Sequence, residues 1–263
     1  HFGEWNEPGA DMTEVMAPKY EEATAYLAYS LSCMEKIALA VHKDEDAKEY
    51  AELTARVKEA YCHYFVTEDG IKSDRMCKYV RPLALGLITD SEIRKKAAEE
   101  LNQLVIKEKY HVGTGFLSTP FLLPVLSEYG YNETAYKMLL CEEYPSWLYE
   151  VEQGATTIWE NWDGIASRNH YSNGAVCQWI FETMCGIRLQ KPQHFVIAPV
   201  PSEKLKEAKA SFISPYGIVA CGWKHENEKY IYTVEIPAGC TAELKLMGKE
   251  PEMVSAGCYT FCI

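Results

Sequence analysis

The sequence predicts a mainly helical fold with a β appendage: helices over residues 1–188, followed by an antiparallel β-sandwich over residues 189–263. Two observations lead to this prediction. In the first region apolar residues recur at close to a 3.6-residue period, which is the spacing of one helix face. After residue 188 short apolar or alternating segments are interrupted by Pro, Gly and Asn about every ten residues, which is typical of a sandwich.

The helices are expected in successive pairs joined by short links. Residues 20–41 and 44–65 form the first pair, and the short connection between them predicts antiparallel neighbours. Asp90 is a typical N-cap residue for a helix that starts after it, whereas Pro82 is expected to kink its helix. The remaining helices are predicted at 77–87, 92–107, 116–129, 132–141 and 174–184.

The strands of the second region are expected to be short and connected by hairpins. Residues 225–227 and 238–239 fit hairpin turns. Few candidate catalytic groups occur there, so a structural role is expected for this region. The strands are predicted at 195–199, 208–214, 217–223, 230–236 and 241–246.

Composition excludes several classes of function. The formal net charge of −12 argues against nucleic acid and anionic membrane surfaces as partners, since both require clustered Lys and Arg. No apolar run approaches the ~20 residues that span a bilayer. The ten cysteines are dispersed without a CxxC pair, so neither zinc nor another metal or cofactor is expected, and a reducing, cytoplasmic setting is favoured.

Residues 154–164, with the sequence GATTIWENWDG, form the most informative segment of the chain. Glu160 and Asp163 lie among Trp159 and Trp162, between glycines that suit a turn. Acids are rarely buried without a partner, and Trp is costly to expose. The segment therefore predicts either a sugar-cleaving pocket with an aromatic wall and reacting carboxylates, or a core loop whose acids cap the backbone. Spacing alone leaves both interpretations open.

Three other segments carry candidate site residues. Glu4 and Trp5 again place an acid beside an indole, and Trp5 could instead pack onto the core. His170 precedes a predicted helix close to Glu160, where a structural role is the alternative. Residues 111–116 are glycine-rich, but they lack the Lys and the preceding strand of a phosphate-binding loop.

Several of these segments, taken in order, resemble a known family. Residues 2–5, 111–116, 119–126, 145–148, 154–163 and 169–171 are similar to the C-terminal half of a bacterial α-L-rhamnosidase of glycoside hydrolase family 78. The resemblance covers nearly the whole chain and is most specific over residues 154–160. It implies part of an (α/α)6 toroid followed by a β-sandwich, in an inverting hydrolase that releases terminal α-L-rhamnose from rhamnosides.

The resemblance also implies roles for individual residues. Glu160 would be the general base, which activates the attacking water. Trp5, Trp162 and His170 would line the rhamnose subsite. The substrate-binding set would further include Glu4, where the family usually has Asp, and Asp163, which would orient the substrate or cap the loop. Trp159 follows the motif, with its ring expected in the core.

The general acid of the family lies in a motif upstream of His1, and no segment here resembles it. The predicted helices are also too few for a complete toroid. We therefore expect this chain to be the base-bearing part of an enzyme that an N-terminal segment or a second subunit completes. The alternatives are a non-catalytic carbohydrate-binding or scaffold fragment, or another enzyme on the same toroid. A phosphorylase is disfavoured, because the Glu160 loop carries no basic residue before Arg168.

Overall fold

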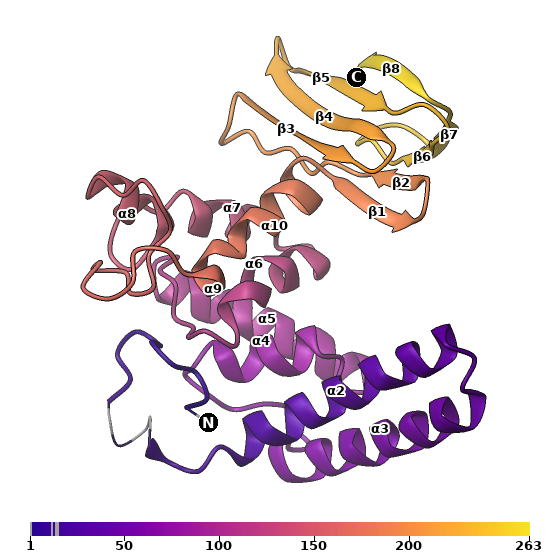
Figure 1. Cartoon of the computed structure of the whole chain (residues 1–263). Helices are drawn as coiled ribbons and strands as arrows, with labels where there is room; N and C mark the ends of the chain where they lie inside the picture. Colours follow the sequence, from indigo (N-terminus) through magenta and orange to yellow (C-terminus); the bar gives the residue numbers. More distant parts are fainter. Residues whose placement is uncertain (1, 12, 14–15) are drawn as a thin grey trace. The chain divides into compact units, whose positions relative to one another are not determined.

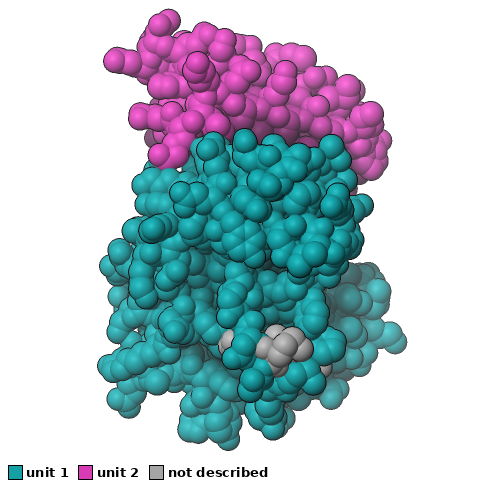
Figure 2. Space-filling model, turned by 90° about the vertical axis from the view of Figure 1, so that its left-hand side faces the viewer, with its two compact units in different colours: residues 1–174 teal, residues 175–263 magenta. Residues whose placement is uncertain are grey.

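The computed structural model describes residues 2–11, 13 and 16–263 and forms two compact units, His1–Gly174 and Ala175–Ile263 (Figure 2). The helical segments end at Met184, and the first strand begins at Ile187. The predicted domain boundary between residues 188 and 189 stays a prediction. Among the described residues no helix is long and apolar enough to cross a membrane.

The first unit is built from helix pairs, as predicted. Helices α2 (Tyr20–Ala40) and α3 (Asp44–Phe65) run side by side as an antiparallel hairpin (Figure 1). Ala25 and Ala28 of α2 are fully buried against Tyr61 of α3. The next helices are α4 (Cys77–Ala84), α5 (Ser91–Lys107), α6 (Thr119–Glu128) and α7 (Asn132–Leu139).

Local sequence explains where several of these helices begin and end. The Asp90 carboxylate accepts the N–H groups of Glu92 and Ile93 at 2.8 and 2.9 Å, so it caps α5 as predicted. Pro120 occupies the first turn of α6, where its missing N–H costs nothing. The sequence did not predict the short helix α8 (Trp147–Glu152), which the Ser146 hydroxyl caps through the N–H of Tyr149.

The helix predicted over residues 174–184 is interrupted. It forms α9 (Tyr171–Gly174), α10 (Val176–Trp179) and a π-helix, η1 (Ile180–Met184). The second unit begins within this stretch. The Trp223 indole donates to the carbonyl of Met184 at 2.8 Å, which fixes the end of the π-helix.

The second unit is a sandwich of two four-stranded sheets, which confirms the predicted class (Figure 1). Neighbouring strands are antiparallel except β2 and β6, which pair in parallel. One sheet has the order β1 (Ile187–Lys191), β2 (His194–Ile197), β6 (Thr241–Leu244), β7 (Glu252–Val254). The other has the order β3 (Glu207–Ser214), β4 (Gly217–Glu226), β5 (Lys229–Ile236), β8 (Gly257–Cys262).

Strands β1, β7 and β8 were not predicted, because each buries little. In β1 only Ile187 is buried, and in β7 only Val254. Of the predicted strands, β2, β4, β5 and β6 supply the core between the sheets, where Phe195 and Trp223 are buried, whereas β3 buries only Ser214. Alternation is a weak signal for a strand that contributes a single side chain to the core.

Candidate active site

The N-terminal segment, residues 2–11, carries Glu4 and Trp5 and is held by polar contacts. The Glu4 side chain is 1% exposed, 3.2 Å from the Arg81 guanidinium. The carboxylate accepts the N–H of Ser118 at 3.2 Å and also accepts the Ser118 hydroxyl. Both Glu4 oxygens are therefore occupied by protein groups, and its predicted contact with substrate stays a prediction.

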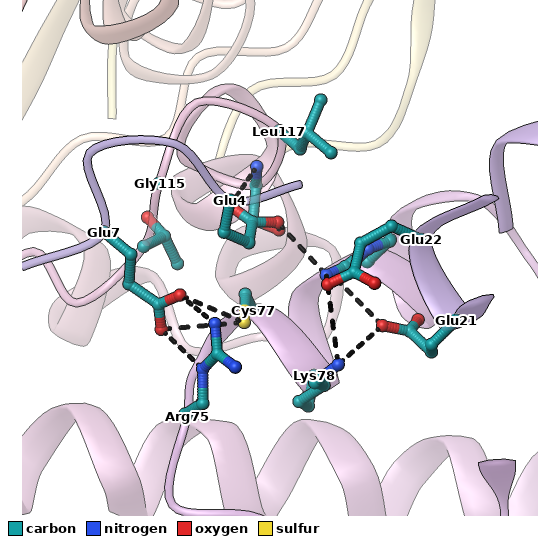
Figure 3. A network of polar contacts seen from close by, with 12 residues as sticks. Glu4, Glu7, Glu21, Glu22, Arg75, Cys77, Lys78, Gly115 and Leu117 are labelled. Atoms are coloured by element: carbon teal, nitrogen blue, oxygen red, sulfur yellow. Dashed lines mark hydrogen bonds and ion pairs between the residues drawn. The ribbon is translucent and has the colours of Figure 1, made fainter. Parts of the chain in front are cut away.

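Arg81 is the centre of a larger buried network. Its guanidinium lies 3.1 Å from Glu21 and 3.4 Å from Glu22, both on α2. Lys78, one turn earlier on α4, faces the same two carboxylates (Figure 3). These ion pairs join α4 to α2 and, through Glu4, to the N-terminal segment.

A second ion pair holds the same segment further along. Glu7 faces Arg75, whose Nε donates to one carboxylate oxygen at 2.9 Å (Figure 3). The Cys77 thiol lies 3.7 Å from that oxygen. The path of residues 4–7, and with it the position of Trp5, is therefore fixed at both ends.

Burial and the neighbouring positive charges shift the pKa values of the acids in this network in opposite directions. Burial raises the pKa of Glu4 above its ordinary value, although Arg81 and Ser118 oppose the change. Burial also favours a higher pKa for Glu22, but there Arg81 and Lys78 outweigh it, so the pKa of Glu22 is lowered. The guanidinium of Arg81 thus lowers the pKa of both Glu4 and Glu22.

Backbone contacts bring three distant segments together around Trp5. The N–H of Phe116 donates to the carbonyl of Trp5 at 2.9 Å. The Ser172 hydroxyl donates to the carbonyl of Phe116 at 2.8 Å, and the Phe116 ring stacks on His170 with centroids 4.2 Å apart. Trp5 and His170, predicted to share one site, are therefore linked through Phe116.

Gly115 allows the close approach between the N-terminal segment and the loop before α6. A Cβ at this position would lie 2.6 Å from backbone atoms of Glu4 and Trp5. We expect Gly115→Ala to destabilise the protein by about 1–3 kcal/mol, because backbone must move to relieve the overlap. Urea denaturation measures the loss. Gly174→Ala is the matched control, since its Cβ would meet no atom within 4 Å; equal stability of the two variants would contradict the prediction.

Two cavities adjoin Trp5. The first, here called the Trp5 cavity, has a volume of about 300 Å³ and is lined by Trp5, Trp162 and Asp163, together with Asn161 and Tyr144. The second, of about 570 Å³, is mainly aromatic. Its lining includes Phe2, Trp5, Tyr26, Phe116 and Tyr171. Three of the predicted site residues thus share one cavity, whereas Glu160 and His170 line neither.

Glu160 is half-buried on the loop that leads to Trp162. Its N–H donates to the carbonyl of Ser167 at 2.8 Å, and the N–H of Ser167 donates to Glu160 Oε2 at 3.3 Å. Oε1 makes no hydrogen bond with the described residues. Among the described residues, the carboxylate is therefore held by one hydrogen bond.

The other residues of this loop have distinct environments. Trp162 is buried and meets the Trp147 ring edge-on, with centroids 5.5 Å apart. The Trp159 ring is buried too, as expected, with Arg168 5.5 Å above it. Asp163 is exposed and accepts the N–H of Ile165 at 3.2 Å, so it caps a turn inside the loop.

His170 stacks on two aromatic rings. Its ring centroid lies 4.2 Å from that of Phe116 and 5.3 Å from that of Tyr171. Its Nδ1 accepts the N–H of Ser172 at 3.3 Å. Its contact with substrate stays a prediction. Within the described part of the chain, no group of three or more His, Cys, Asp or Glu side chains is placed to hold a metal ion.

Sequence reasoning missed Glu150, a buried acid on α8. The residue is 2% exposed, and burial raises its pKa to about 7, although the N–H of Trp159 opposes the shift. Its Oε2 accepts that N–H at 3.0 Å. No local pattern distinguishes Glu150 from the exposed Glu152 two residues later, so only the fold identifies it.

Glu150 is expected to make stability depend on pH. A raised pKa means that the folded state favours the protonated acid, so this stabilisation is complete below pH ~4.5 and is lost as pH rises through about 7. Glu150→Gln stays neutral throughout. As pH rises from 5 to 8, we therefore expect the free energy of unfolding of the variant to increase relative to that of the parent by on the order of 2 kcal/mol. Urea titrations at both pH values measure the gain, and parallel pH profiles would exclude it.

The helix pairs of the first unit and the β-sandwich of the second define a protein of helical-hairpin and sandwich architecture, and the cavities beside Trp5 combine aromatic and acidic side chains. Aromatic faces and carboxylates are the groups that sugar-cleaving sites combine.

Comparisons with known proteins identify the family. The bacterial α-L-rhamnosidase six-hairpin glycosidase domain matches residues 1–184, and the bacterial α-L-rhamnosidase C-terminal domain matches residues 186–258. The chain belongs to the bacterial α-L-rhamnosidase family. Its first region is thus part of the six-hairpin toroid that the resemblance implied.

Individual relatives agree with this assignment. An α-L-rhamnosidase of Streptomyces avermitilis is 34% identical over 93% of this chain, which corresponds to 25% of the relative. The structure of the Aspergillus terreus α-L-rhamnosidase matches the whole chain with a TM-score of 0.94 and 29% identity, over 33% of its own length. The Streptomyces avermitilis α-L-rhamnosidase complexed with L-rhamnose matches the whole chain with a TM-score of 0.89 and 30% identity, over 28% of its own length. The chain thus spans about a quarter to a third of these relatives.

Proposed function

We propose that the protein containing this chain is an inverting α-L-rhamnosidase in which Glu160 is the general base. The observation that carries the proposal is the loop of residues 158–163, which holds the half-buried Glu160 close in sequence to Trp162 and Asp163 on the wall of the Trp5 cavity. Membership of the rhamnosidase family and the L-rhamnose complex of the Streptomyces avermitilis relative support rhamnosides as substrates.

The reaction requires two carboxyl groups on opposite sides of the sugar. Glu160 takes a proton from a water molecule, whose oxygen attacks the anomeric carbon as the bond to the leaving oxygen breaks. A carboxylic acid about 6.5–9.5 Å away protonates that leaving oxygen. The product is β-L-rhamnose, the inverted anomer. Trp5, Trp162 and His170 are proposed to contact the sugar, with Asp163 and Glu4 orienting it or its neighbours.

The general acid is proposed to come from an N-terminal segment or a second subunit that completes the toroid. Helix α2 supports this proposal, because it exposes large apolar side chains that a partner would cover. These are Tyr20, Leu27, Tyr29, Met34, Ile37 and Leu39. Full activity of residues 1–263 alone on an aryl α-L-rhamnoside would exclude the need for a completing segment.

The anomer released first tests the mechanism. The full-length protein is mixed with an aryl α-L-rhamnoside, and the product is followed by proton NMR before mutarotation. We expect β-L-rhamnose to appear first and the α anomer to grow in later. Initial release of α-L-rhamnose would refute inversion, and no release of rhamnose would refute the proposed activity.

We further propose that the protein works in a reducing compartment such as the cytoplasm. Cys77, Cys185, Cys221 and Cys240 are buried and act as small apolar side chains of the cores. Labelling of thiols in protein trapped directly from cells tests this, since all ten should react after denaturation without a reductant. Labelling that requires a reductant would contradict it.

A further inference from the structure

The backbone of Trp159 and of Glu160, the proposed base, is held by two buried polar side chains from different elements. Glu150 lies on α8, and its Oε2 accepts the N–H of Trp159 at 3.0 Å. Asn173 lies on α9, and its Nδ2 donates to the carbonyls of Trp159 at 3.0 Å and of Glu160 at 3.2 Å. Each of the two residues is 2% exposed.

The two side chains are themselves fixed by their surroundings. The backbone carbonyl of Asn173 accepts the Trp147 indole N–H at 3.0 Å, and this bond connects α9 to the first residue of α8. Ser146 caps α8 and so holds the helix that carries Glu150. The same indole packs against Trp162 on the far side of the loop. These connected contacts therefore support the loop both before and after Glu160.

We propose that Asn173 and Glu150 are positioning residues that fix the Trp159–Glu160 backbone and thereby aim the Glu160 carboxylate at the attacking water. This inference rests on the proposed role of Glu160. Among the residues that the structure describes, a single 3.3 Å contact, from the N–H of Ser167, holds the carboxylate itself. Its position is therefore set mainly through the backbone, and a displacement of about 1 Å in such a group can cost on the order of 10²-fold in rate.

The chemistry of the two residues differs in a way that the experiment can use. Asn173 acts as a donor to two carbonyls, which a hydrocarbon side chain cannot replace. Glu150 acts as an acceptor, a role that the amide oxygen of Gln retains. Glu150→Gln should therefore keep the loop in place, whereas Glu150→Leu and Asn173→Leu should release it.

The test measures kcat and KM of the full-length protein on an aryl α-L-rhamnoside for these three variants. We expect Asn173→Leu and Glu150→Leu to lower kcat by about 10–100-fold, with KM changed by less than about threefold because neither side chain lines the Trp5 cavity. Glu150→Gln should keep kcat within about threefold of the parent. Equal losses in Glu150→Gln and Glu150→Leu, or losses in KM alone, would overturn the proposal.

Hydrogen exchange of the peptide containing residues 155–168 provides an independent measurement that requires no activity. Release of the backbone should accelerate exchange there by about tenfold in the two Leu variants and leave it unchanged in Glu150→Gln. Asn102→Leu is the matched control, since Asn102 is also buried but accepts the Thr134 hydroxyl between α5 and α7. This control should keep both kcat and exchange over residues 155–168 at the parent values.

The outcomes separate the two proposals. If Glu160→Gln leaves kcat unchanged, the proposed base fails, and exchange still shows whether Asn173 and Glu150 hold the loop. If Glu160→Gln abolishes activity while the Leu variants keep parental kcat, the base stands and the positioning role is refuted. Unchanged exchange in the Leu variants also refutes it.

Discussion

Replacing Glu160 with Gln is expected to lower kcat of the full-length protein on aryl α-L-rhamnosides by about 10²–10⁴-fold. An amide cannot accept a proton from water, while its size and its contact with the Ser167 N–H can be kept. KM should change little, because Glu160 does not line the cavity that Trp5 and Trp162 share. Steady-state kinetics measure both constants.

Azide distinguishes loss of the base from general damage to the site. This anion needs no deprotonation, so it can attack the anomeric carbon in Glu160→Gln and form a rhamnosyl azide of inverted, β configuration as the aglycone leaves. Glu152→Gln is the control, since Glu152 is exposed on the same stretch of chain. Parental kcat in Glu160→Gln, or azide that restores nothing, would argue against the assigned role.

Replacing Arg81 with Met is expected to destabilise the protein by about 3–5 kcal/mol at neutral pH. The change removes the cation that lies within 3.1–3.4 Å of Glu4, Glu21 and Glu22, and these acids would remain buried without it. Because Glu4 joins Arg81 to the N-terminal segment, the loss should also remove one of the contacts that hold this segment. Chemical denaturation gives the change in the free energy of unfolding.

The pH dependence of this loss identifies its cause. Without Arg81 the buried carboxyls should take up protons more readily in the folded state than in the unfolded chain, so the deficit of Arg81→Met should shrink as pH falls from 7 to 5. Lys95→Ala is the control: it breaks an exposed pair with Glu92 and should cost no more than about 0.5 kcal/mol. A deficit that is independent of pH would point to packing rather than charge.

Local patterns predicted most elements of the fold. The helix over Asp44–Phe65 is found at the predicted residues, and Asp90 caps α5. Elements with few buried residues were missed, including β1 and the short α8. The break of the last predicted helix into α9, α10 and a π-helix was not predicted either, because its apolar spacing remains that of a continuous helix.

Some residues of the candidate site were also indicated by local sequence patterns, whereas others were found only in the structure. The sequence indicated Trp5, Trp162 and Asp163, which line one cavity, because acids beside indoles form a recognisable local pattern. Arg81 and Glu150 carry no such pattern. In a sequence both are typical surface residues, yet both are buried here.

The sequence by itself determined the helix-then-strand order, the family resemblance and the loop around Glu160, since each depends on residues close together in the chain. Only the tertiary structure showed that Arg81 holds Glu4, that Phe116 links Trp5 to His170, and that Asn173 and Glu150 support the Glu160 backbone. The physical reason is sequence separation. Glu4 and Ser118, for example, are 114 residues apart, and burial, which sets the strength of such polar contacts, is a property of the packed unit rather than of any local segment.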